Sequence, residues 1–172
     1  MRLSPEDLCM LWDDTVSFLE QLGLYSGEDA RDLACVAMPK RGVVELRVGS
    51  AAGHRTHVDL NNKTLEYYDR DRNVNRVMKR LFESSGARCK LREDGVFCDI
   101  SNADLEGIFA SLAAPTSMDY RLGDPKAWWA KKKTYHIWEK CGDGHVDSED
   151  FEFCAISEVL SDAKRLRSFA PR

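Results

Sequence analysis

Hydrophobic positions follow two different periods along the chain, and the first is helical. Apolar residues recur every three or four positions over 8–22. They follow Ser4-Pro5-Glu6-Asp7, a sequence typical of a helix start, and Gly23 predicts the end of that helix. A second helix is expected from Ser26 to about Met38, because Pro39 would stop it.

A period of two, which is typical of half-buried strands, appears in the middle of the chain. Apolar and polar residues alternate there in short runs that are separated by turn residues such as Asn61-Asn62 and Glu93-Asp94-Gly95. The pattern predicts five strands. They lie at 42–48, 56–60, 64–68, 87–92 and 96–100.

Helical spacing returns between and after these strands. An amphipathic helix is expected over 73–85, with Gly86 at its end. Another begins with Ser101 as its cap and reaches about Leu112, and a last one starts near Ser148.

These elements predict an α+β fold. We expect a mainly antiparallel sheet with the 73–85 and 102–112 helices packed on one face, and helical N- and C-terminal segments. The predicted organisation is an N-terminal helix (1–28), an α+β core domain (29–115) and a C-terminal helical extension (116–172).

Composition predicts an ordinary globular protein. The chain has 172 residues, of which 43% are hydrophobic and 31% charged. A chain of this size can bury about 70% of its unfolded surface, so it needs no metal or disulfide to fold. It has no apolar run of membrane-spanning length, and its N-terminus lacks the apolar core of a signal peptide. A soluble, intracellular protein without a membrane partner is therefore expected.

The six cysteines are scattered and form no CxxC pair. In an intracellular protein, such residues are mostly small buried hydrophobes that remain thiols. Cys89 and Cys98 flank the predicted hairpin turn symmetrically and could face each other on the sheet. A disulfide there is allowed by the pattern but is not favoured.

Charge is distributed unevenly along the chain. Residues 70–92 contain eight Arg or Lys against two acids, a net charge of +6, in a protein whose total is −4. Such a local reversal of sign is typical of a surface that binds phosphate, although a solvated helix face has the same composition. The candidate nucleic-acid contacts are Arg72, Arg76, Lys79, Arg80, Arg88, Lys90 and Arg92.

The stretch from about Ala30 to Ala114 resembles one half of a LAGLIDADG homing endonuclease. The residues that carry the resemblance lie in a strand–helix–hairpin–helix order. They are 67–82, 86–91, 95–101, 104–106 and Phe109. The resemblance implies a sheet that faces nucleic acid. It places the family's namesake helix at 33–42, where no acid stands at the metal-binding position, so it implies binding rather than cleavage and no catalytic residue.

The C-terminal segment resembles an EF-hand loop, with Gly144 at the sharp turn. The resemblance implies Asp143, Asp147 and Asp150 as metal ligands, with Ca²⁺ or Mg²⁺ as the ion. Glu139 stands where the loop usually begins with Asp, Cys141 replaces an oxygen ligand, and Asp150 replaces the final Glu, so the simpler prediction is a capped turn without a cofactor. A zinc set of His136, Cys141, His145 and Cys154 has no standard spacing.

Other sites of chemistry are absent from the sequence or weak. No P-loop, GxSxG or Rossmann motif is present. His57 and Asp59 share one face of a predicted strand, an arrangement that is more often structural than catalytic. The sequence therefore predicts a non-catalytic nucleic-acid-binding protein. The alternatives are a protein-binding inhibitor, chaperone or assembly subunit, and a calcium-responsive regulator.

Overall fold

The computed structural model describes residues 3–21, 33–48, 54–69, 72–113, 139–142 and 149–167. Strands and helices follow one another in the order that the sequence predicts, with one exception described below. The elements are α1 (Pro5–Gln21), β1 (Leu33–Met38), β2 (Val43–Val48), β3 (His54–Asp59), β4 (Thr64–Asp69), α3 (Arg72–Ser84), β5 (Arg88–Arg92), β6 (Gly95–Asp99), α4 (Leu105–Leu112) and α7 (Glu149–Arg167).

The strands form one six-stranded sheet in the order β1-β2-β3-β4-β6-β5, and every neighbouring pair is antiparallel. The 88–99 hairpin inserts β6 next to β4, so β5 becomes the outer strand. Gly95 begins β6 at a φ of +135°, and a Cβ there would lie 2.2 Å from the Tyr67 carbonyl oxygen. Only glycine fits this close approach of β6 to β4.

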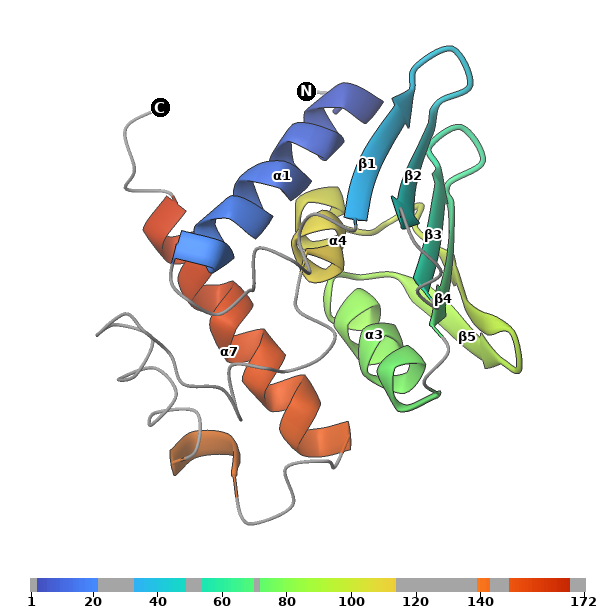
Figure 1. Cartoon of the computed structure of the whole chain (residues 1–172). Helices are drawn as coiled ribbons and strands as arrows, with labels where there is room; N and C mark the ends of the chain where they lie inside the picture. Colours follow the sequence, from blue (N-terminus) through green and yellow to red (C-terminus); the bar gives the residue numbers. More distant parts are fainter. Residues whose placement is uncertain are drawn as a thin grey trace.

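The helices lie on one side of this sheet (Figure 1). Alternate strand residues point into the core beneath them, among them Val44, Val58 and Leu65, which are almost fully buried. The aromatic ring of Tyr67 meets that of Phe82 from α3 edge to face, at 5.7 Å between ring centres. The predicted α+β fold, with α3 and α4 sharing this core, is confirmed.

Both terminal segments belong to the same core. On α1, the buried Trp12 donates its indole N–H to the carbonyl of Leu112 on α4, at 3.2 Å. On α7, Phe151 and Ile156 are buried in the cluster that includes the sheet and α3. The helical ends that the sequence set apart from the 29–115 domain therefore complete its hydrophobic core.

The start of α1 follows its sequence signals, whereas the start of α4 departs from them. Ser4 and Asp7 form a reciprocal capping box, with Asp7 N–H donating to Ser4 Oγ and Ser4 N–H to Asp7 Oδ2. Hydrogen bonds from Ser4 to the Asp7 carboxylate, first from its backbone N–H and then from its hydroxyl, lower the pKa of Asp7. Contrary to the prediction, Ser101 does not cap α4. It donates instead to the Asp99 carboxylate, and Asp104 precedes the helix.

The predicted helix from Ser26 to Met38 is wrong where the structure describes it. Residues 33–38 form strand β1 at the edge of the sheet, with Cys35 opposite Leu46 of β2. Alanines and an apolar run favour a helix locally. Pairing with β2 satisfies the backbone hydrogen bonds of this short segment, so tertiary contacts override the local helix propensity. The LAGLIDADG resemblance places its namesake helix over the same residues, so that helix is not present at 33–38.

The expectation of free, buried cysteine thiols is also wrong. All six cysteines are paired, and no free thiol remains. The bonds join Cys9 of α1 to Cys35 of β1, Cys89 of β5 to Cys98 of β6, and Cys141 to Cys154 of α7.

Within the described ranges, no helix has the length and apolar character needed to cross a membrane.

Candidate nucleic-acid interface

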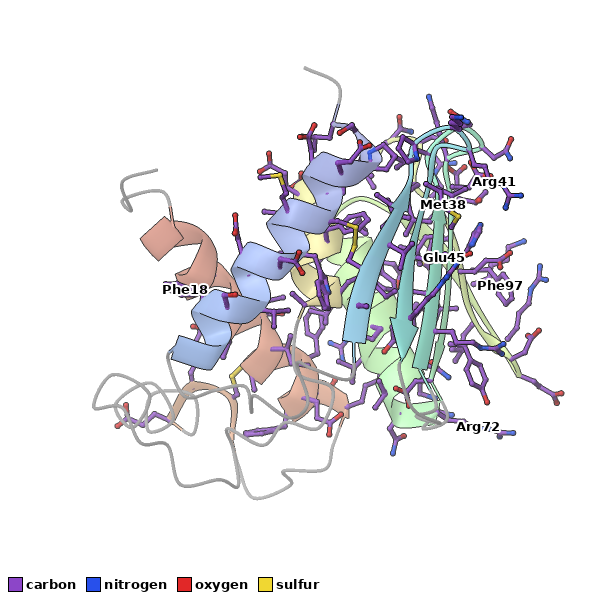
Figure 2. All side chains as sticks on the ribbon, turned by 45° about the horizontal axis from the view of Figure 1, so that its top comes forward. Phe18, Met38, Arg41, Glu45, Arg72 and Phe97 are labelled. Carbon is purple, nitrogen blue, oxygen red and sulfur yellow. A yellow bond between two sulfur atoms is a disulfide. The ribbon has the colours of Figure 1, made fainter. Side chains whose placement is uncertain are left out.

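The sheet has an open face on the side away from the helices. In the part of the chain that the structure describes, no helix covers this face, and Phe97 projects from it (Figure 2). Because strand residues alternate, every second side chain of each strand reaches this surface. One row crosses it from edge to edge through directly paired positions. The row consists of Val36, Glu45, His57, Glu66, Phe97 and Lys90.

Strand β5 contributes a basic row to one edge of the open face. Arg88, Lys90 and Arg92 stand at alternate positions, and all three are exposed. Cys89, between the first two, points to the opposite side, where it bonds to Cys98. The sequence predicts this common orientation, and the structure places the three cations together on the outer strand.

Aromatic rings lie on the same face as this basic row. The guanidinium carbon of Arg92 lies 4.9 Å from the centre of the Phe97 ring. Farther across the sheet, the guanidinium carbon of Arg55 on β3 lies 5.2 Å from the centre of the Tyr68 ring on β4. Both distances suit cation–π attraction, so each partly exposed ring is paired with an exposed cation.

An open groove of about 540 Å³ runs between β4, β6 and β5. Its basic wall is formed by Arg88 and Lys90, and Phe97 forms part of its surface. Carboxylates also line it, so the groove is amphoteric rather than uniformly positive. The lining residues are Asn62, Lys63, Thr64, Leu65, Glu66, Arg88, Cys89, Lys90, Phe97, Cys98, Asp99 and Ser101.

Asp99 in this groove is held by its own partners. It accepts hydrogen bonds from the backbone N–H and hydroxyl of Ser101, at 2.8 and 2.6 Å. The bond from the Ser101 hydroxyl, followed by the one from its backbone and smaller effects of Arg88 and Lys63, lowers the pKa of Asp99. Asp99 is therefore a fixed anion in the groove, where it offsets part of the charge of Arg88.

The middle of the open face carries a charge network of mixed sign. Glu45 accepts from Arg47 Nε at 2.9 Å, and its second oxygen lies 3.1 Å from His57 Nδ1. The bond from Arg47, with a smaller contribution from His57, lowers the pKa of Glu45 against the opposing effect of burial. His57 and Asp59 share this face, as predicted, and Asp59 accepts from Asn61 and Asn62 in the following turn. No arrangement among these residues resembles a nucleophile with its base.

Lys79 and Arg80 of α3 lie on the helical side of the sheet, apart from the cations of β5. Arg80 donates to Asp150 of α7 at 2.7 Å, and its guanidinium carbon lies 4.2 Å from the centre of the Phe153 ring. Lys79 pairs with Glu83 one turn along the helix at 3.1 Å. The structure thus separates the seven predicted contacts into two groups and uses Arg80 to join two helices. The remaining members of the α3 group, Arg72 and Arg76, are exposed.

The predicted metal ligands are not assembled in the described ranges. Asp143 and Asp147 lie outside them, and Asp150 accepts from Arg80. Cys141 and Cys154 are bonded to each other, which removes two members of the zinc set. Over those ranges, no group of three or more His, Cys, Asp or Glu side chains is positioned to hold a metal ion.

Sequence reasoning missed the aromatic part of this interface. Tyr68 and Phe97 stand at outward positions of correctly predicted strands, each two residues from an exposed carboxylate, Glu66 and Asp99 respectively. The alternation could have revealed them, because it places both aromatic residues on the same face as exposed acids, and large aromatic side chains are more often buried. Arg55 lies just before the predicted start of its strand at residue 56, so the alternation pattern does not include it.

Comparison of the chain with protein-family models, curated proteins and solved structures finds no match. The resemblances to LAGLIDADG endonucleases and EF-hands therefore stay predictions, and the site is interpreted from its own geometry.

Proposed function

We propose that this protein binds nucleic acid, without catalysis, through the open face of its sheet. The observation that carries the proposal is the row of Arg88, Lys90 and Arg92 on β5. Three exposed cations at alternate positions of one strand are spaced by about 6.4–6.8 Å, twice the strand rise. That spacing allows them to contact successive phosphates of an extended backbone, and such contacts dominate nucleic-acid affinity.

The geometry narrows the predicted contact set. The β5 cations and Arg55 share the open face, whereas Lys79 and Arg80 are engaged on the helical side. We therefore assign binding to the β5 group and a structural role to Arg80. The calcium-regulator alternative has no support from the positions of Cys141 and Asp150, which have other partners.

The test compares two variants that each remove one Arg and one Lys. Arg88→Gln/Lys90→Gln changes the open face, and Arg76→Gln/Lys79→Gln changes α3. Anisotropy with a labelled oligonucleotide is measured over a salt series. The β5 pair should weaken binding and flatten the plot of log affinity against log salt by up to about 0.9 for each phosphate that is no longer neutralised. The α3 pair should leave both quantities unchanged. Equal effects of the two pairs would contradict the assignment of binding to β5.

A protein partner is the second candidate, and the position of β5 favours it. β5 is an outer strand of the sheet, so an extended acidic peptide could pair with its backbone and neutralise its side chains. Salt separates the candidates only partly, since an acidic peptide is also screened. Competition does so directly: an acidic peptide that displaces the oligonucleotide at equal concentration would favour the protein-binding alternative.

A further inference from the structure

The two aromatic side chains of the open face are arranged as a stacking surface. Phe97 of β6 stands opposite Glu66, two residues before Tyr68 on β4, so the rings occupy diagonal positions on adjacent strands. Residues so related lie about 7–8 Å apart. Gly95 lies beside Tyr68, its Cβ position 3.3 Å from the Tyr68 Cα, and therefore adds no side chain between the rings.

Each ring also has a cation within reach of a bound phosphate. Arg92 lies over Phe97 and Arg55 over Tyr68, and both arginines are exposed to solvent. A base that displaces either guanidinium from its ring face brings its own phosphate next to that arginine, which is then free to pair with it. Stacking with backbone neutralisation is how proteins hold single strands, because every base has a π-face.

We propose that the open face binds single-stranded nucleic acid, with bases stacked on Phe97 and Tyr68 and the backbone along β5. The inference rests on the proposed function and specifies its ligand. A duplex keeps its bases stacked on each other, and its grooves admit a helix or a two-stranded ribbon rather than a broad sheet face. A single strand can lay unstacked bases on that face.

The test uses three probes of the same length, about 12 nucleotides, within the range of single-strand site sizes. They are an oligothymidylate, its duplex with oligoadenylate, and an abasic oligomer with the same phosphates. The wild-type protein should bind the oligothymidylate most tightly. Phe97→Leu should weaken that binding about tenfold, within the range for removal of one stacked base, and leave abasic binding unchanged. Phe97→Tyr, which keeps a ring, should bind like the wild type.

The outcomes separate this inference from the function on which it rests. Equal affinity for the abasic and thymidylate probes, or tighter binding to the duplex, would overturn base stacking and leave phosphate binding intact. No binding to any probe at low salt would remove both. Circular dichroism of each variant confirms that weaker binding is not a loss of fold.

A second inference comes from the sulfur chemistry and does not depend on nucleic acid. The chain contains six cysteines, and the structure joins all of them in three bonds. Each bond requires two thiols to give up two protons and two electrons to an oxidant. Cytosolic thiol systems keep such pairs reduced, whereas the thiol–disulfide oxidants of secretory and extracellular compartments form them.

We infer that this protein matures in an oxidising compartment. The pairing is complete, and the bonds lie at three separate places: between α1 and β1, across the 88–99 hairpin, and onto α7. The prediction of free thiols followed from the predicted intracellular location, and the paired cysteines do not fit that location.

The test quenches cells that make the protein with acid and then alkylates extracts with a maleimide polymer. The protein should show no mobility shift unless it is first reduced, and six adducts after reduction, one for each cysteine. The full set of adducts without reduction would overturn the inference. An intermediate number of adducts without reduction would overturn the inference for the disulfides that are reduced in the cell, and peptide mapping identifies these.

Discussion

Removing the disulfides one at a time should destabilise the protein in the order of the loops that they close. The perturbation is a pair of Cys→Ala changes at each bond, because alanine leaves no unpaired polar group in the core. The sequence separations are 26 residues for Cys9–Cys35, 13 for Cys141–Cys154 and 9 for Cys89–Cys98. Chain-entropy loss in the unfolded state then gives about 3.5, 2.9 and 2.6 kcal/mol, respectively.

The assay is urea unfolding of each double variant without reductant, followed by circular dichroism. A decrease of about 3.5 kcal/mol is large against the ~5–15 kcal/mol total stability of a typical domain. The internal control is the same series in reductant, where the wild-type protein should fall to the level of the variants apart from small packing differences. If each variant kept wild-type stability without reductant, or if the 9-residue loop mattered most, the chain-entropy argument would be refuted.

Three further changes test the sheet. Asn75→Ala removes two hydrogen bonds, each 2.9 Å, between the buried Asn75 side chain on α3 and the end of β4, and should cost about 2 kcal/mol in urea unfolding. Gly95→Ala introduces a Cβ that meets the Tyr67 carbonyl oxygen, and should lower the melting temperature by several degrees, whereas an unchanged melting temperature would contradict that close approach. Glu45→Gln should lose stability at neutral pH through its ionised bond to Arg47. Because the folded-state pKa of Glu45 is lowered, the difference from the wild type should disappear as pH falls below the ordinary carboxyl value of about 4.3.

Most of the fold could be predicted because its signals are local. The strand at 64–68 and the turn at Asp94-Gly95 can be predicted from neighbouring residues alone, and the structure confirms both. β1 could not be predicted in this way, since an alanine-containing apolar run suits either a helix or a buried edge strand. Its conformation is decided by pairing with β2, which no local pattern reveals.

The cysteine pairing was beyond the sequence for a different reason. Six cysteines allow 15 connectivities, so spacing alone cannot select one. Cys9 meets Cys35 only because α1 packs beside β1, a segment for which the sequence predicts a helix. The pair that sequence symmetry does indicate, Cys89 with Cys98, is formed by the hairpin that was predicted correctly.

The candidate site shows why one basic run became two surfaces. Residues 70–92 are continuous in sequence, but the chain passes from α3 to β5 within this run. Helix α3 packs on one side of the sheet, whereas Arg88, Lys90 and Arg92 of β5 reach the other side. The net charge of the run therefore does not reveal which side of the sheet each cation reaches. Only the side on which α3 packs determines that Arg80 meets Asp150 while Lys90 reaches the open face.

The disulfide across the hairpin connects the sulfur chemistry to the proposed binding face. A strand that slips by one residue turns all of its side chains to the opposite side, and an outer strand such as β5 has a neighbour on one edge only. Cys89 and Cys98 are directly paired and bonded on the core side, so their bond fixes the register that directs Arg88, Lys90 and Arg92 outward. Replacing this pair by alanine should therefore weaken oligonucleotide binding more than replacing Cys141 and Cys154, although its predicted cost in stability is smaller. Equal binding by the two variants would show that the sheet holds β5 in register without the bond.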